Sequence, residues 1–226
     1  AFEELLAHYL SLKRVRAGIR AQTAPALAGG ALVERLRARL PFALTGAQER
    51  VLREIAADMA LPQPMQRLVQ GDVGSGKTIV AACAALIAVE SGYQAAFMAP
   101  TELLAEQHAK NLTEWLDPLG VGVTFLAGRL NAAARTRALI DIAEGRAGIV
   151  VGTHALFQDE VRFARLGLVV VDEQHRFGVQ QRLRLRAKGG ANGITPHQLI
   201  MSATPIPRTL AQSVYADLDV SVRSAE

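Results

Sequence analysis

Short apolar runs and amphipathic stretches alternate along the chain from Pro41 onward. Wholly apolar runs such as Leu168–Val171 are typical of strands buried on both faces of a sheet, whereas apolar residues at three- and four-residue spacing indicate helices. The predicted strands are Arg67–Gln70, Ala95–Ala99, Val121–Leu126, Gly148–Gly152, Leu168–Val171 and Leu199–Ser202. The predicted helices are Ala47–Met59, Lys77–Val89, Glu102–Leu116 and Asn131–Glu144. This alternation predicts an α/β fold with a mostly parallel sheet and helices on both faces.

The first forty residues follow a different pattern. Apolar residues within 5–15 recur at helical spacing, and Gly29-Gly30 separates this stretch from a second short helix. The chain starts at Ala1 without an initiator methionine, so we expect it to be a piece of a longer protein. Residues 1–40 are predicted to be a helical linker segment from a preceding domain, and residues 41–226 to form the α/β domain.

Composition narrows the class of protein. Half of the 226 residues are hydrophobic and 20% are charged, which is enough apolar material for a packed core. No apolar run reaches the ~18 residues of a membrane span, and no signal-peptide pattern is present, so we expect no membrane association. The single cysteine, Cys83, fits a reducing cytoplasm and lies in an apolar run, where a buried small side chain is expected. The net charge of +4 permits phosphate binding without arguing strongly for it.

A glycine-rich motif lies between a predicted strand and a predicted helix. It matches the P-loop pattern in full: Gly71, Asp72, Val73, Gly74, Ser75, Gly76, Lys77 and Thr78. Glycines let backbone N–H groups turn toward phosphates, and the start of the following helix adds unsatisfied N–H groups to the same anion site. We expect Lys77 to reach the β- and γ-phosphates of a nucleotide and Thr78 to bind Mg²⁺. A chance glycine-rich turn is the alternative, and the flanking strand and helix argue against it.

Two adjacent carboxylates, Asp172 and Glu173, directly follow the apolar strand Leu168–Val171. Such a pair would repel without a cation, so it argues for a metal site. We expect Asp172 to hold Mg²⁺ through water and Glu173 to orient or deprotonate the attacking water. A solvated turn is the commoner reading of this pair alone, but the P-loop in the same chain favours catalysis.

Further motifs stand in a characteristic order. Residues 172–175 read Asp-Glu-Gln-His, a DExH box, and Ser202-Ala203-Thr204 follows the strand thirty residues on. Residues 44–48 lie upstream of the P-loop at the place of a Q-motif, 99–108 resemble motif Ia, and 152–155 resemble motif Ib. Together with the P-loop, these motifs resemble the first RecA-like lobe of a superfamily II helicase, a P-loop NTPase.

Two longer strings narrow the resemblance. Residues 172–178 read Asp-Glu-Gln-His-Arg-Phe-Gly, and residues 201–210 read Met-Ser-Ala-Thr-Pro-Ile-Pro-Arg-Thr-Leu. Both, like the tail 215–222, are similar to the RecG family of bacterial DNA helicases, which remodel stalled forks and branch-migrate junctions. Transcription-repair coupling double-stranded DNA translocases share part of these strings and stay as the alternative. Gln174-His175 and the tail favour the RecG family.

The resemblance implies ligand contacts for three further residues. Gln48 should read the adenine of ATP, because an amide offers the donor and acceptor that match adenine N7 and N6. Thr101 and Thr153 each lie between the end of a predicted strand and the start of the following helix. Each can therefore cap a helix and offer N–H groups to a DNA phosphate, a contact that is independent of base sequence.

The resemblance also implies coupling residues in this chain and further domains in the same parent protein. His175, Ser202 and Thr204 would couple the state of the nucleotide to the DNA side. A second helicase lobe, with its arginine finger, and a wedge domain that recognises branched DNA would come from the same parent chain. The implied function is ATP-driven remodelling of branched DNA in recombination and repair, with ATP and Mg²⁺ as cofactors, in the bacterial cytoplasm. A nucleotide- or DNA-binding module without turnover is the second hypothesis; the DExH box argues against a P-loop kinase or GTPase.

Other polar residues receive no predicted chemistry. His8, His108 and His197 have no metal-ligand spacing with other His or Cys residues. Trp115 is predicted to lie in the core. The basic residues after the DExH box are expected to form a solvated helix face, with DNA contact as the alternative; they are Arg182, Arg184, Arg186 and Lys188.

Overall fold

The computed structural model describes residues 22–72, 74–172, 194–203 and 219–222. Within these ranges, seven strands form one sheet in the order β3-β4-β2-β5-β6-β1-β7, and every neighbouring pair is parallel. The strands are β1 (Gln66–Gln70), β2 (Gln94–Met98), β3 (Val123–Leu126), β4 (Ile149–Gly152), β5 (Leu166–Asp172), β6 (His197–Ser202) and β7 (Asp219–Val222). The predicted α/β fold with a parallel sheet is confirmed.

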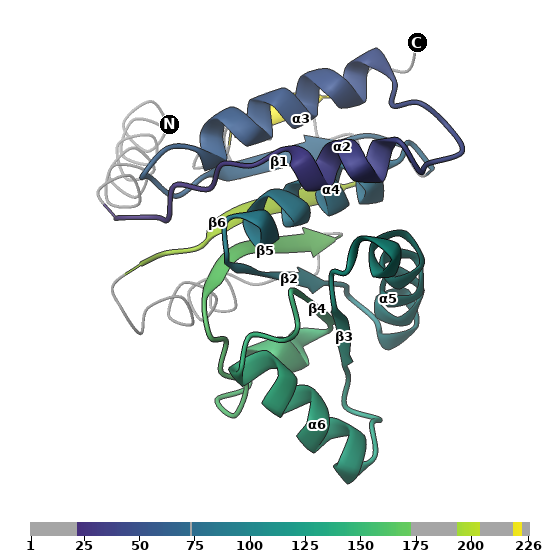
Figure 1. The fold of residues 1–226 in the computed structure, drawn as a ribbon, viewed down its shortest axis with the longest axis vertical. Coiled ribbons are helices and arrows are strands. Elements are labelled where there is room, and N and C mark those ends of the chain that lie inside the picture. The colour runs from purple at the N-terminus through teal and green to yellow at the C-terminus, as the bar shows by residue number, and fades with distance from the viewer. Residues whose placement is uncertain (1–21, 73, 173–193, 204–218, 223–226) are drawn as a thin grey trace, which may run out of the picture.

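Helices cover both faces of the sheet, as predicted. The helices are α2 (Ala31–Arg37), α3 (Gly46–Met59), α4 (Lys77–Glu90), α5 (Glu102–Leu116) and α6 (Ala132–Ala143), with short 3₁₀ helices η1 (Asp117–Leu119) and η2 (His154–Phe157). In one core cluster, the helices α2, α3, α4 and α5 pack against the sheet. In a second core cluster, α6 and η2 pack against it. Neighbouring residues of one strand, such as Val69 and Leu68, enter opposite clusters, because side chains alternate across a strand. Figure 1 shows α2 and α3 at one end of the molecule and α6 at the other.

Helix α4 is the centre of the larger core. Its residues from Ile79 to Ala88 are all buried, because the sheet lies against one side while α2 and α3 pack against it as well. The sequence of α4 therefore shows an apolar run instead of a one-sided stripe. Cys83 is fully buried there, as predicted, and burial raises the pKa of its thiol to about 12. Across the described ranges, no helix has the length and apolar character that a membrane span requires.

The segment before residue 41 packs onto the same core. Leu27, Val33 and Leu36 belong to the larger cluster. The carboxylate of Glu90, at the end of α4, accepts hydrogen bonds from the first N–H groups of α2, at Ala31 (3.1 Å) and Leu32 (3.2 Å). Residues 22–40 are thus joined to the α/β core by packing and by hydrogen bonds. The division at residue 40 stays a prediction, and the expected helix within 5–15 lies outside the described residues.

Strand β7 is a feature that the hydrophobic pattern did not predict. It pairs with β1 in parallel, from Arg67 opposite Asp219 to Gln70 opposite Val222. A four-residue stretch of mixed polar and apolar residues carries little strand signal on its own. Its backbone becomes a strand because the edge of β1 offers hydrogen-bonding groups to pair with.

Candidate functional site

The sheet brings several of the predicted site residues to one edge. All strands are parallel, so their carboxyl ends meet at the same edge, where ligands of open α/β sheets bind. The P-loop follows β1, Asp172 ends β5, and Ser202 ends β6. Thr101 follows β2 and Thr153 follows β4. Segments that are far apart in the sequence therefore lie along one edge of the fold.

The P-loop forms an open anion cradle. Gly74 (φ 79°) and Gly76 (φ 73°) adopt left-handed backbone conformations that side chains disfavour. Gly76 is the N-cap of α4 and has no side chain that could cap the helix, so the positive end of the helix dipole adjoins the loop. The Ser75 hydroxyl oxygen is buried without a hydrogen-bond partner. An uncapped helix start next to an orphaned buried hydroxyl fits the phosphates of a nucleotide.

The side chain of the P-loop lysine, Lys77, lies against the first two residues of the loop. The ammonium group of Lys77 donates hydrogen bonds to the backbone oxygens of Gly71 (2.6 Å) and Asp72 (2.8 Å). Thr78 follows it in the first turn of α4 and is half-buried. Lys77 and Thr78 thus both stand in the first turn of α4; their contacts with phosphate and Mg²⁺ stay predictions. Val73 lies outside the described residues.

Backbone pairing places Asp172 near the P-loop. The Gly71 N–H donates to the Ser202 oxygen (3.2 Å), and β6 lies between β1 and β5. Asp172 pairs with Met201 in the register of β5 and β6. No group of three metal-ligating side chains occurs in the described part of the chain. Magnesium at a P-loop keeps several waters and needs only one or two protein ligands, so Thr78 as a ligand and Asp172 acting through water fit the chemistry of this ion.

Gln48 is held against the P-loop by a capping box. Its side-chain oxygen accepts from the N–H of Thr45 (2.7 Å), and the Thr45 hydroxyl accepts from the N–H of Gln48 (3.3 Å). The side-chain amide also donates to the Ser75 backbone oxygen (3.2 Å). Gln48 thus caps α3 and contacts the phosphate loop at once. Its contact with adenine stays a prediction.

The two predicted helix starts differ. Thr101 is exposed, and its hydroxyl accepts from the Leu104 N–H (3.3 Å), so it caps α5 as predicted. Thr153 precedes η2, makes no side-chain capping bond and is buried, with 4% of its surface exposed. The expectation of a capping side chain is therefore wrong for Thr153, because a 3₁₀ helix follows it instead of an α-helix and its side chain is buried. A phosphate contact there would have to use backbone N–H groups.

His108 is the site residue that sequence reasoning missed. Its Nε2 lies 2.7 Å from the Asp172 Oδ2, and both side chains are largely shielded from water. Metal-ligand spacing could not find this contact, because the partner is a carboxylate 64 positions away. The available signal was a polar residue on the inward face of α5, among Ala105, Ala109 and Leu112.

Of the other residues singled out in the sequence, His197 and Trp115 have structural roles, and several more lie outside the described residues. His197 is fully buried; its Nδ1 accepts from the Met65 N–H (3.0 Å) and its Nε2 donates to the Pro25 oxygen (2.7 Å), which gives it a structural role. Burial lowers the pKa of this imidazole from its ordinary value. Trp115 is partly buried and packs against the larger core cluster, as predicted. Several predicted residues lie outside the described ranges: Glu173, Gln174, His175, Arg182, Arg184, Arg186, Lys188 and Thr204.

Comparison with known proteins places the chain among helicases. Residues 45–213 match the model of the DEAD/DEAH box helicase family. The chain is 60% identical over 221 residues to the ATP-dependent DNA helicase RecG of Escherichia coli O157:H7, covering 97% of this chain and 32% of the relative. The RecG of Pasteurella multocida is 59% identical, with 98% and 32% covered. The chain therefore spans about a third of the length of these relatives.

Solved structures give the same fold. A structure of RecG bound to a three-way DNA junction superposes with a TM-score of 0.87 at 40% identity, covering all of this chain and 30% of the other. The yeast DEAD-box splicing factor Prp28 superposes over 87% of this chain, and 48% of its own, with a TM-score of 0.63 at 19% identity, which shows the fold alone. The predicted resemblance to RecG and the RecA-like fold are confirmed.

Proposed function

Because the chain belongs to the DEAD/DEAH box helicase family, we propose that it is the ATP-binding lobe of a RecG-type DNA helicase that remodels branched DNA in recombination and repair. The observation that carries this proposal is the arrangement at the carboxyl edge of the sheet. The P-loop, Ser202 and Asp172 lie on neighbouring strands, linked by the hydrogen bond from Gly71 to Ser202. This arrangement suits a nucleotide whose phosphates lie over α4 and whose metal faces Asp172.

The residues divide the work of hydrolysis. The N–H groups of the P-loop and of the start of α4 hold the phosphates, and Lys77 turns from the loop oxygens to the β- and γ-phosphates. Thr78 would bind Mg²⁺ and Asp172 would hold it through water; the ion, when bound, offsets the charge on the phosphate oxygens. Glu173 orients or deprotonates the attacking water. His175, Ser202 and Thr204 relay the state of the nucleotide to the DNA side.

The DNA partner follows from α5 and from the relatives. Exposed Thr101 presents the start of α5 to a DNA phosphate, a contact that carries no base specificity. The RecG structure similar to this chain holds a three-way DNA junction. Since the chain spans about a third of its relatives, the second lobe with its arginine finger and the wedge domain would come from the rest of the parent protein, in the bacterial cytoplasm. An arginine finger contributes ~10³-fold or more to the rate in related NTPases, so the isolated lobe should turn over slowly.

A junction assay with the parent protein tests this function. A labelled three-way DNA junction is incubated with the parent protein and either ATP or a non-hydrolysable analogue, and the products are separated by size. We expect conversion of the junction with ATP only. Conversion that is equal with the analogue, or ATP-driven movement along linear duplex without action on junctions, would contradict the proposal; the second result would favour the translocase alternative.

A further inference from the structure

His108 is the one polar side chain among the buried residues of α5. The others are Ala105, Ala109, Leu112 and Leu116. A buried polar group needs a partner, and here the partner is Asp172, at 2.7 Å from Nε2 to Oδ2. An ionised carboxylate only accepts hydrogen bonds, so His108 donates through Nε2–H. The contact joins α5 to the end of β5.

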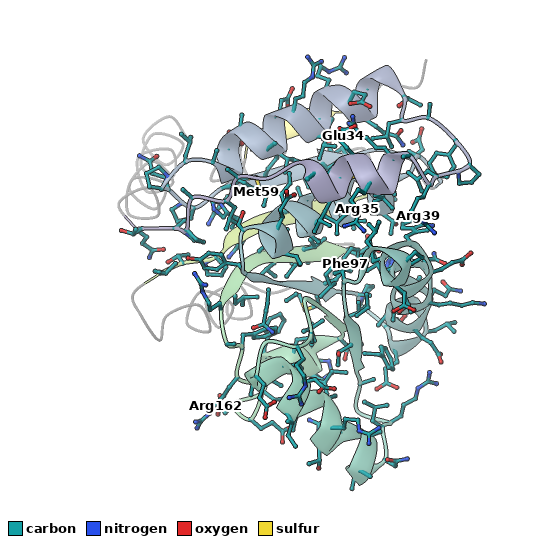
Figure 2. All side chains as sticks on the ribbon, in the orientation of Figure 1. Glu34, Arg35, Arg39, Met59, Phe97 and Arg162 are labelled. Atoms are coloured by element: carbon teal, nitrogen blue, oxygen red, sulfur yellow. The ribbon has the colours of Figure 1, made fainter. Side chains whose placement is uncertain are left out.

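The surroundings hold this pair in place. The His108 ring lies 4.8 Å from the ring of Phe97, centroid to centroid, with 46° between the planes. Phe97 is buried in β2, and Figure 2 shows it near the middle of the molecule. Only 11% of the His108 side chain and 14% of the Asp172 side chain are exposed. Water therefore has little access to replace this hydrogen bond.

We propose that His108 is a positioning residue that fixes the orientation of the Asp172 carboxylate for Mg²⁺ and ties it to α5. The inference rests on the proposed role of Asp172. Metal-binding groups are commonly oriented by a second hydrogen-bond partner, and loss of that partner typically weakens metal binding. His108 has the position and the burial that such a partner requires.

The same contact links the metal to the DNA end of α5. Thr101 caps this helix, and His108 follows seven residues later, about 10 Å along the axis. The two residues therefore sit on one helix, with Thr101 exposed at its start and His108 against Asp172. A phosphate contact that shifts the start of α5 changes the position of the Asp172 partner.

Two matched variants of the parent protein separate the hydrogen bond from the ring contact. His108→Phe keeps a ring against Phe97 and removes the donor; His108→Gln supplies an N–H donor near the Nε2 position and removes the ring. The readout is the Mg²⁺ concentration that half-maximally strengthens binding of a fluorescent N-methylanthraniloyl ADP. We expect His108→Phe to raise this concentration about tenfold, the lower end of the range for lost partners of metal ligands. His108→Gln should stay close to wild type.

Other outcomes overturn the inference. If His108→Gln is impaired and His108→Phe is normal, the ring contact carries the effect. If both variants match wild type, His108 positions nothing. Should His108→Phe fail to fold, as judged by its thermal unfolding without ligands, His108→Asn replaces it, because its shorter amide stops short of Asp172 and should show the same tenfold rise.

Asp172→Asn separates this inference from the proposed function. An unchanged Mg²⁺ requirement in Asp172→Asn would remove the metal role of Asp172, and the role of His108 with it. A raised requirement in Asp172→Asn beside a normal one in His108→Phe would overturn the inference alone. Adding the three-way junction should shift the Mg²⁺ requirement of wild type and His108→Gln but not of His108→Phe; an equal shift in all three would overturn the link through α5.

Discussion

Gln48 joins two parts of the nucleotide site through its side-chain amide. The oxygen accepts from Thr45 and the nitrogen donates to the Ser75 backbone oxygen, so its orientation is set by the fold. An amide has two protons and two acceptor lone pairs, and these contacts use one of each. Gln48 therefore retains one donor and one acceptor with which it can bind adenine. Capping and base recognition, which the sequence presents as alternatives, are compatible in this geometry.

Substitution of Gln48 tests that compatibility. Gln48→Glu keeps an oxygen that accepts from Thr45, as a capping box allows, and that can accept from adenine N6, but it loses the donor to adenine N7. We expect the parent enzyme to prefer ATP over GTP, and Gln48→Glu to lower kcat/KM for ATP about tenfold, since an unmatched buried polar contact costs ~1–3 kcal/mol. ATP should stay preferred in this variant, because the retained oxygen opposes the O6 acceptor of guanine. The measurement is kcat/KM for ATP and for GTP. Gln48→Ala should lose the preference and also ~1 kcal/mol of stability from the cap.

An unchanged kcat/KM for ATP in Gln48→Glu, or an unchanged ratio of ATP to GTP use in Gln48→Ala, would leave Gln48 as a helix cap only. Equal use of both nucleotides by the wild-type enzyme would have the same meaning. Neither result would affect the assignment of the P-loop as the phosphate-binding segment, because contacts with phosphate do not depend on the base.

Local motifs and tertiary contacts were not equally predictable at the residue scale. The P-loop could be predicted in place, because its glycines, lysine and threonine act within one short segment. The Asp172–His108 contact could not, because it depends on how α5 packs against β5. Thr153 was mistaken for a cap since sequence does not distinguish an α-helix from the 3₁₀ turn that follows it.

At the scale of elements, periodicity predicted the central α/β layers well. Every predicted strand and helix within the described ranges is present, with bounds that differ by two residues or fewer. Strand β7 was not predicted from the sequence, because pairing with β1, and not its own hydrophobic pattern, makes it a strand. The packing of residues 22–40 escaped because Gly29-Gly30 is typical of a linker, whereas Leu27 and Leu36 are fully buried.

His197 makes the attachment of the N-terminal segment sensitive to pH. Burial lowers its pKa from 6.5, and neutral His197 joins Pro25 to Met65, the residue before β1. The unfolded chain takes up a proton below about pH 6.5, which the folded chain resists. The contribution of His197 to the free energy of unfolding is therefore complete above that pH and decreases as the pH falls below it, by up to about 1.4 kcal/mol per pH unit.

Urea unfolding of the 226-residue chain at about pH 7.5 and pH 5.5, on either side of the ordinary imidazole pKa, measures this effect. His197→Gln is the matched control, because an amide can accept and donate but does not titrate. We expect the wild type to lose more stability than His197→Gln on acidification. Equal losses in the two proteins would show that other groups cause the pH dependence.

At the scale of the whole molecule, the parent motor should bind DNA through its phosphates. The helix start at Thr101 offers a phosphate contact, which carries no base specificity. We expect affinity for a junction to be independent of base sequence and to fall steeply between low and physiological salt, because phosphate contacts release counterions. Fluorescence anisotropy with junctions of unrelated sequence measures both. A dissociation constant that does not change with salt would contradict this mode of binding.

The rate of ATP hydrolysis by the parent protein, with and without a three-way DNA junction, tests the central claim most directly. The claim is that the edge formed by the P-loop, Ser202 and Asp172 hydrolyses ATP under the control of branched DNA. We expect the junction to raise the rate in wild type, and Lys77→Ala to abolish hydrolysis with and without DNA while its thermal unfolding stays close to wild type, because the ammonium group bonds to loop oxygens outside the core. Hydrolysis by Lys77→Ala at a near wild-type rate would contradict the claim, as would a wild-type rate that the junction leaves unchanged.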